Sequence, residues 1–367
     1  MKRNTVKPQT DEVLLTAMDT FRRFSKKTGP NDNLQTREFK EVVDHVKAYE
    51  KSHPATLTKE ESESYLLYHF IRHYQESLSV LNELSHTPKK VLEIGSGSGP
   101  FALAALMKGA NDVTMADSNR YALELGADLI AKQGFPVTLR YWSFPENHLP
   151  EGKFDLIAFP YSLREVTNNS FDMQEKLIAH CATRLTDDGI MVFIDRSEPA
   201  SNKHILMLRD RFQQENRQII APCIWTGKCP ALESKVTCFA QRAYEKPALL
   251  GKIQSASSIN SNSLKFSYLI VAYHKKAAPM PSRPLYRVVS PALTIHNQKR
   301  YMLCGIDGKK MIGTQMDEVP QACRAFEFLE RGAVVEVEHA RETSAFLDLE
   351  PDSSLKVIAA PGKPLIL

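Results

Sequence analysis

The segment VLEIGSGSGP, from Val91 to Pro100, constrains the fold more than any other part of the sequence. An apolar run leads into Glu93, glycines follow at alternate positions, and a proline then opens an apolar helical pattern. Glycine lets the backbone turn tightly and approach a ligand that a Cβ atom would block. Proline fits the first turn of a helix, where its missing N–H costs nothing. The segment therefore predicts a buried strand, a ligand-binding loop and a helix.

Strand and helix patterns alternate downstream of Lys89. The further strand patterns are DVTMADSN, VTLRYWSF, KFDLIAFPYSL and GIMVFIDR, and apolar helical patterns separate most of them. RQIIAP and KFSYLIVAYHK supply a final pair of strands, one on each side of a cysteine-rich segment. This alternation predicts an α/β fold, a doubly wound sheet with its ligand at the carboxyl ends of the strands.

We expect three consecutive regions in the chain. A helical N-terminal region covers residues 1–88, with a turn at Gly29-Pro30 and a helix that Thr58 caps with Glu61. The sheet domain covers 89–278 and carries a cysteine insert at 221–242. A small β-rich C-terminal domain covers 279–367, after the linker AAPMPSRP, and has turn signals such as Asp307-Gly308.

The charge is mildly basic, with a formal net charge of +4 and a pI near 8.6. This permits contact with nucleic acid without requiring it. The basic residues gather near the N-terminus and in the C-terminal region, at Lys2, Arg3, Lys7, Arg22, Arg23, Lys26, Lys27, Lys299, Arg300, Lys309 and Lys310. No apolar run approaches the roughly 20 residues that span a bilayer, and no secretory signal is present, so we expect a soluble intracellular protein without a membrane partner.

The carboxylate of Asp117 ends the second strand pattern, where it can accept hydrogen bonds from a ribose. A dinucleotide or S-adenosylmethionine could use this arrangement. The spacing E-x-G-x-G-x-G differs from the dinucleotide pattern and resembles motif I of class I methyltransferases, which implies their Rossmann-like fold and S-adenosylmethionine as the cofactor. The candidate cofactor-binding residues are Glu93, Gly95, Gly97, Gly99, Asp117, Ser118, Trp142 and Ser143.

No catalytic residue can be assigned from the sequence. FPYSLREV, after the fourth strand, lacks the D/N-P-P-Y pattern of amino-methylating enzymes, and the cysteine nucleophile of cytosine-C5 methylases is missing from its expected places. Tyr161 and Glu165 belong near the mouth of the pocket, but a packing tyrosine and a solvated glutamate are equally good readings. Whether methyl transfer occurs is left open, with a retained fold around a vestigial pocket as the alternative.

Three of the six cysteines, Cys223, Cys229 and Cys238, lie in APCIWTGKCPALESKVTCF. In a reducing compartment such clustering favours metal binding or redox chemistry. Three thiolates do not close a tetrahedral structural site, so a fourth ligand must come from elsewhere. Cys304 precedes a glycine turn and suits a ligand, whereas Cys181 and Cys323 lie in helical patterns. Spacing alone does not separate zinc from an iron–sulfur cluster, and three unrelated thiols are the alternative to both.

Several ordered motifs together resemble the methyltransferase-like assembly factors of the mitochondrial small ribosomal subunit and their bacterial relatives. They span roughly residues 60–310 and comprise HFIRHYQESLSVLNEL, the glycine loop, PC…CP…CFAQR, KFSYL, RVVSP and the Cys-x-x-Asp-Gly of 304–308. The resemblance implies a [4Fe-4S] cluster on Cys223, Cys229, Cys238 and Cys304. It also implies the small ribosomal subunit and its rRNA as partner, in a bacterial cytoplasm or, in a eukaryote, in the mitochondrial matrix. No oligomer is expected.

The sequence departs from that family at two places. Cys223-Ile224-Trp225 stands where the family often has Cys-Pro-His, which leaves the thiolates intact. DRSEP, from Asp195 to Pro199, replaces an E-x-G-x-P-like turn at the rim of the cofactor pocket and puts methyl transfer in question. The expected function is a cofactor-binding, cluster-bearing factor that methylates rRNA or assists subunit assembly. The alternatives are an inactive assembly protein with this fold and a small-molecule methyltransferase with a structural zinc site.

Overall fold

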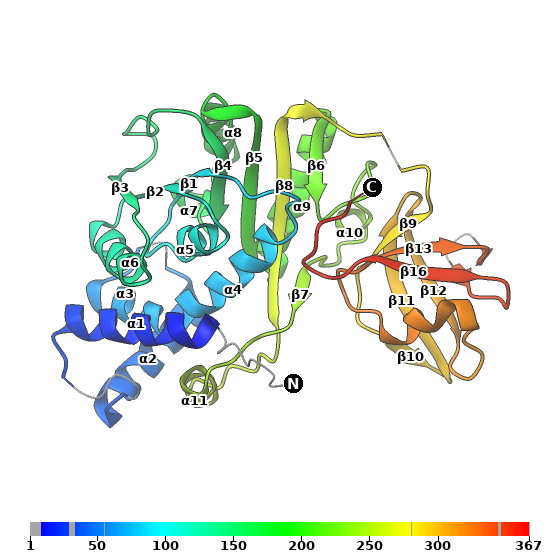
Figure 1. Cartoon of the computed structure of the whole chain (residues 1–367), viewed down its shortest axis with the longest axis horizontal. Helices are drawn as coiled ribbons and strands as arrows, with labels where there is room; N and C mark the ends of the chain where they lie inside the picture. Colours follow the sequence, from blue (N-terminus) through cyan, green and yellow to red (C-terminus); the bar gives the residue numbers. More distant parts are fainter. Residues whose placement is uncertain (1–8, 29–33, 55, 280, 344–345, 367) are drawn as a thin grey trace, which may run out of the picture. The chain divides into compact units, whose positions relative to one another are not determined.

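The computed structural model describes residues 9–28, 34–54, 56–279, 281–343 and 346–366 (Figure 1). The chain divides into two compact units. The first comprises Met1–Leu81, Thr87–Thr186 and Ala243–Leu264, and the second Asn82–His86, Asp187–Arg242 and Lys265–Leu367. Because these units interleave along the chain, the three consecutive regions expected above stay a prediction. Lys2, Arg3, Lys7 and the Gly29-Pro30 turn lie outside the described residues.

Four helices open the first unit: α1 (Gln9–Ser25), α2 (Thr36–Ser52), α3 (Lys59–Leu66) and α4 (His69–Leu81). The predicted cap of α3 is present, since the Glu61 N–H donates to Thr58 Oγ1 (3.2 Å) and the Thr58 N–H donates to the Glu61 carboxylate (2.8 Å). The sequence pattern favoured one continuous helix after this cap. The helix instead breaks at Leu67 and Tyr68, whose N–H groups turn back to carbonyls three residues earlier.

Four parallel strands of the first unit lie in the order β3-β2-β1-β4. They are β1 (Lys90–Ile94), β2 (Asp112–Asp117), β3 (Thr138–Tyr141) and β4 (Phe154–Pro160). The helices that accompany them are α5 (Pro100–Met107), α6 (Arg120–Lys132), α7 (Leu163–Val166), α8 (Phe171–Ala182) and α11 (Ala248–Ala256). β1 and β4 are buried along most of their length, as strands covered on both faces must be. The predicted α/β fold with a doubly wound sheet is confirmed.

The second unit contains the predicted final pair of strands. β8 (Leu264–Lys276) runs antiparallel to β5 (Leu185–Arg196) and to β6 (Arg217–Ala221), and the short β7 (Ala240–Arg242) also pairs with it. Helix α9 (Pro199–Gln214) precedes β6, and the short helix α10 (Pro230–Glu233) lies within the cysteine segment. The cysteine segment therefore lies between β6 and β8 in the chain, as its sequence position predicted.

The C-terminal residues form a second sheet, as predicted from their short β patterns. Its strand order is β14-β15-β12-β11-β9-β13-β16, with β10 beside β11. The strands are β9 (Leu285–Val288), β10 (Leu293–Ile295), β11 (Gln298–Gly305), β12 (Gly308–Gln315), β13 (Val334–Glu338), β14 (Arg341–Glu342), β15 (Phe346–Asp348) and β16 (Ser354–Ala359). The predicted turn at Asp307-Gly308 joins β11 to β12, where Gly305 pairs with Gly308.

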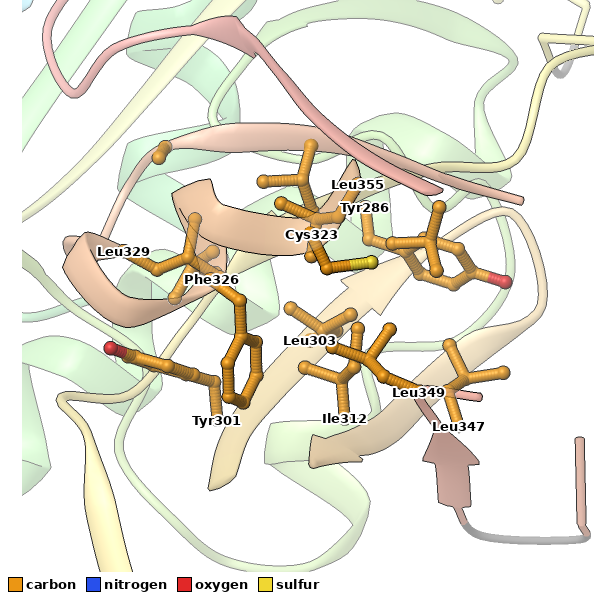
Figure 2. Packing of buried hydrophobic residues seen from close by; sticks show 14 residues of the cluster. Tyr286, Tyr301, Leu303, Ile312, Cys323, Phe326, Leu329, Leu347, Leu349 and Leu355 are labelled. Carbon is orange, nitrogen blue, oxygen red and sulfur yellow. The ribbon is translucent and has the colours of Figure 1, made fainter. Parts of the chain in front are cut away.

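A 3₁₀ helix, η1 (Gln321–Phe328), covers the apolar core of this second sheet (Figure 2). Phe326 meets Tyr301 edge to face, with ring centroids 5.2 Å apart. Cys323 is fully buried among Leu303, Ile312 and Leu355, and its Sγ donates to the Ser353 carbonyl (3.2 Å). Cys323 therefore serves as a packing residue of this core.

Among the described residues, no helix is both long enough and apolar enough to cross a membrane.

Candidate functional site

The glycine loop joins β1 to α5 at the carboxyl end of the first unit's sheet. Gly95 has φ +65°, and a Cβ atom there would lie 2.4 Å from the Ser162 Cβ atom, so only glycine lets the loop pass this close. Gly97 has φ +51°, and a Cβ atom there would meet no atom within 4 Å. The loop is thus packed tightly at its base and borders open space at its middle.

Asp117, at the end of β2, is tied to this loop. Its carboxylate accepts hydrogen bonds from the N–H of Gly97 (2.7 Å) and of Asn119 (2.7 Å). Burial raises the pKa of the Asp117 carboxyl, and these backbone donors act against that rise. The carboxylate is therefore held in place at the edge of the open space beside Gly97.

A cavity of about 100 Å³ lies against the glycine loop, entirely within the first unit. Three polar side chains that line it have buried oxygens without a hydrogen-bond partner among the described residues: Glu93 Oε1, Ser96 Oγ and Ser98 Oγ. Buried polar atoms normally find partners, so these oxygens mark where a polar ligand would bind.

The structure brings only some of the predicted cofactor residues to this cavity. Glu93, Gly95, Gly97 and Asp117 line it. The other predicted residues, Gly99, Ser118, Trp142 and Ser143, are not among its lining residues. The Trp142 indole is buried and donates to the Asn147 carbonyl (3.2 Å), while the Ser143 hydroxyl donates to Glu146 (2.5 Å). Their contact with a cofactor stays a prediction.

The helical region before β1 supplies a wall of the cavity that the sequence did not predict. Tyr49, Leu57 and Tyr65 line it from the helical side, and Tyr161 and Glu165 from the segment after β4. An aromatic stripe containing Tyr65 is visible in the sequence, but its helical spacing equally suits core packing. Tyr161 and Glu165 were placed near the pocket mouth by the sequence, and they do line the cavity.

Behind this wall lies a buried polar cluster. Tyr65 Oη and His73 Nδ1 are hydrogen-bonded (2.6 Å), and the His73 ring stacks on the Tyr161 ring with centroids 4.0 Å apart. The Tyr161 hydroxyl donates to the carboxylate of Glu76. Burial raises the pKa of Glu76 from its usual 4.5 to about 7, while Arg72 and Tyr161 act in the opposite direction. Tyr161 has a backbone φ of +60°, which a tyrosine rarely adopts.

The raised pKa of Glu76 predicts a pH-dependent stability. Between about pH 4.5 and pH 7, Glu76 holds a proton in the folded chain that it has lost in the unfolded chain. The contribution of Glu76 to the free energy of unfolding is therefore largest at low pH and is lost as pH rises through 7. In a Glu76→Gln variant, the free energy of unfolding should fall less between pH 5 and pH 8, by on the order of 2 kcal/mol. Denaturant titrations at each pH measure this, with the exposed Glu124→Gln as the control. An unchanged pH profile would contradict the assignment.

The second candidate site is a cavity of about 250 Å³ within the second unit. Cys223, Cys229, Cys238 and Cys304 all line it. The remaining cysteines lie elsewhere: Cys181 is fully buried in α8 of the first unit, and Cys323 is in the core of the second sheet. The structure thus brings together the four thiols that the sequence singled out and leaves the other two apart.

Side chains of α9 hold the cysteine segment in shape. The Arg209 guanidinium donates to the backbone carbonyls of Trp225 and Gly227, and the Asp210 carboxylate accepts from the Cys229 N–H (3.0 Å). Asn202 donates to the Cys238 carbonyl (2.7 Å) and accepts from the Cys238 N–H (3.0 Å). The backbone of the loop is therefore anchored without any ligand.

The buried thiols favour a positively charged ligand. Burial raises the pKa of Cys238 to about 12 and also raises the pKa of Cys229 and Cys304, and the nearby Cys223 sulfur adds to each rise. The four thiols can therefore all lose their protons only when a bound cation compensates the negative charge. Within the described residues, no three His, Cys, Asp or Glu side chains lie close enough to surround a single metal ion. A zinc ion would need sulfurs about 3.8 Å apart, given Zn–S bonds of about 2.3 Å.

The comparisons with known proteins identify the family. Residues 59–316 match the family model described as "Mitochondrial small ribosomal subunit Rsm22". Among solved structures, the chain is similar to the ribosomal protein L11 methylase of Lactobacillus delbrueckii subsp. bulgaricus (15% identity, 56% of this chain and 77% of that chain, TM-score 0.34). It is also similar to the precorrin-6y C5,15-methyltransferase of Geobacter metallireducens GS-15 (15% identity, 54% and 87%, TM-score 0.35). No curated protein matches. Because the family model covers well over half of the sequence, the chain belongs to the Rsm22 family of the mitochondrial small ribosomal subunit.

Proposed function

We propose that this protein binds the small ribosomal subunit through its rRNA and acts in the maturation of that subunit. The observation that carries the proposal is the family match over residues 59–316, because this range contains the glycine loop, Asp117 and all four clustered cysteines. The compartment is then the mitochondrial matrix in a eukaryote or the cytoplasm in a bacterium.

Only part of the basic set named from the sequence is available to rRNA phosphates. Lys310 is buried and paired with Asp307 and Glu342, and Arg22 is also buried. Lys26 is exposed on the N-terminal helical side of the first unit, and Arg23 is exposed there too but is paired with Asp128. Contacts between such side chains and phosphates release counterions, so binding should weaken steeply as salt rises.

Co-sedimentation of the purified protein with isolated small subunits tests the proposal. The bound fraction should be high at low salt and fall steeply between about 50 and 200 mM salt, as expected when several phosphates are neutralised. Large subunits at the same concentration are the control and should retain little protein. Absence from the small-subunit pellet at low salt would contradict the ribosomal function and favour the small-molecule methyltransferase.

We further propose that the glycine-loop cavity binds S-adenosylmethionine. The glycine loop, the anchored carboxylate of Asp117 and the partnerless oxygens of Glu93, Ser96 and Ser98 support this. When bound, the cofactor would supply an electrophilic methyl group. Asp117 would hold the ribose hydroxyls, and the Tyr161 side of the cavity would face the remainder of the ligand. No residue of the wall is assigned as a catalytic base, so methylation of rRNA and assembly without methylation both stay open.

The two carboxylates at opposite ends of β2 provide a matched test of cofactor binding. Asp117→Ala should weaken S-adenosylmethionine binding by about 10- to 100-fold, because it removes charge-assisted hydrogen bonds. Asp112→Ala, at the exposed start of the strand, should leave binding unchanged. Isothermal titration calorimetry measures both. Equal affinity in the two variants would contradict the cofactor site, and no binding by the parent protein would favour the inactive-scaffold alternative.

We also propose that Cys223, Cys229, Cys238 and Cys304 hold a [4Fe-4S] cluster. The shared cavity and the apolar surroundings suit thiolate ligation. In a cluster each thiolate binds a different iron, so the four sulfurs need not surround one ion. A zinc site is the alternative. When bound, the metal centre would supply bonds that link the cysteine segment to β11, and α9 would hold that segment in position for them.

Replacement of single cysteines tests this assignment. The parent protein, purified without oxygen, should contain about four irons and four sulfides per chain and absorb near about 400 nm. Cys304→Ser should lose most of the iron and make the C-terminal sheet more sensitive to protease, because bound metal stabilises the fold that holds it. The Cys323→Ser variant should contain as much iron as the parent protein, since Cys323 lies in the core of the second sheet. A colourless parent protein with stoichiometric zinc would refute the cluster.

A further inference from the structure

Basic side chains gather around the four-cysteine cavity. Arg209, Arg287, Arg331 and Lys309 all line it together with the cysteines. Arg209 is only 2% exposed and Arg287 only 7%. Charged side chains are seldom buried this deeply unless a partner compensates them. These cations therefore need an anionic counterpart.

Carboxylates compensate only some of this charge. Asp210 pairs with Arg209 (2.6 Å). Glu83, itself buried, is shared between Arg242 (2.8 Å) and Arg287 (3.5 Å) and also accepts from the Tyr268 hydroxyl (2.5 Å). Within the described part of the chain, Arg331 and Lys309 have no carboxylate partner, although the Arg331 guanidinium lies over the Phe239 ring at 4.2 Å. The lining of the cavity thus carries an excess of positive charge.

Several N–H donors of these arginines are also buried and unused. Among the residues that the structure describes, Nε of Arg209, Nε of Arg287, and both Nε and Nη1 of Arg331 are buried without an acceptor. Other bonds fix the orientation of two of these groups: Arg287 Nη1 donates to the Gly332 carbonyl (2.9 Å), and Arg209 is held by the cysteine segment. A buried donor without an acceptor destabilises the fold. Several such donors around one cavity indicate that its occupant is rich in acceptors.

We propose that Arg209, Arg287, Arg331 and Lys309 form a cationic shell that stabilises a metal–thiolate centre by charge and by N–H···S hydrogen bonds, with Arg331 contributing most. This inference rests on the metal site proposed above. A cluster core held by four thiolates is anionic, and its sulfurs accept hydrogen bonds. Arg331 is the strongest member because it has two unused buried donors and no carboxylate partner among the described residues. The shell thereby selects an anionic, sulfur-rich centre for this cavity.

A cationic shell has a measurable effect on reduction. One-electron reduction adds negative charge to the centre, and nearby positive charge and N–H donors stabilise the reduced form more than the oxidised form. Loss of a shell member should therefore lower the midpoint potential. It should also weaken metal binding, because residues around the ligands commonly contribute 10- to 100-fold to metal affinity.

Replacement of Arg331 tests the shell. In the full-length protein purified without oxygen, Arg331→Gln should lower the midpoint potential in a redox titration and release iron to a chelator about 10-fold faster than the parent. Arg331→Lys, which keeps the charge but loses the planar fork, should give intermediate values. Arg324→Gln is the matched control, because Arg324 is an exposed side chain of η1 and does not line the cavity.

Lys309→Gln provides a second test if Arg331→Gln disturbs folding, as judged by circular dichroism. Lys309 is partly exposed on β12, where it pairs in register with Cys304. The Lys309→Gln variant should also lower the midpoint potential. An iron-containing parent whose variants keep the same potential and the same rate of iron loss would overturn the shell while leaving the cluster intact. A parent that contains zinc or no metal would overturn the cluster itself.

Discussion

The anchoring of the cysteine segment by α9 is the interaction on which the second unit depends. A loop with two prolines and a glycine has little regular hydrogen bonding of its own, so its backbone groups need partners from elsewhere. Asn202, Arg209 and Asp210, all on helix α9, supply them. Ile224 from the same loop packs against Leu285 and Val334 of the second sheet. The position of the three thiols in this segment therefore depends on one helix and one apolar contact.

The two candidate sites lie in different units and use different chemistry. The glycine-loop cavity offers oxygen acceptors and a buried carboxylate, which suits a neutral or cationic polar ligand. The cysteine cavity offers sulfur ligands and basic side chains, which suits a metal centre with a net negative charge. The glycine loop, Asp117 and the four cysteines all lie within the range that matches the family model.

Local sequence signals predicted the elements whose residues carry strong local preferences. Alternating glycines and a following proline marked the β1–α5 loop, and the capping box of Thr58 and Glu61 marked the start of α3. The break between α3 and α4 was missed because the apolar pattern runs through Leu67 and Tyr68 without a glycine or proline. The wall formed by Tyr49 and Leu57, and the basic lining of the cysteine cavity, could not be predicted, since both depend on residues distant in sequence.

The helical side of the glycine-loop cavity divides the pocket into two parts. Tyr49 and Leu57 line the cavity but lie before residue 59, where the match to the family model begins. The loop, the anchored carboxylate and Tyr65 lie within the matched part of the chain. Substitutions at Tyr49 or Leu57 can therefore change access to the cavity while the loop and the Asp117 carboxylate stay in place.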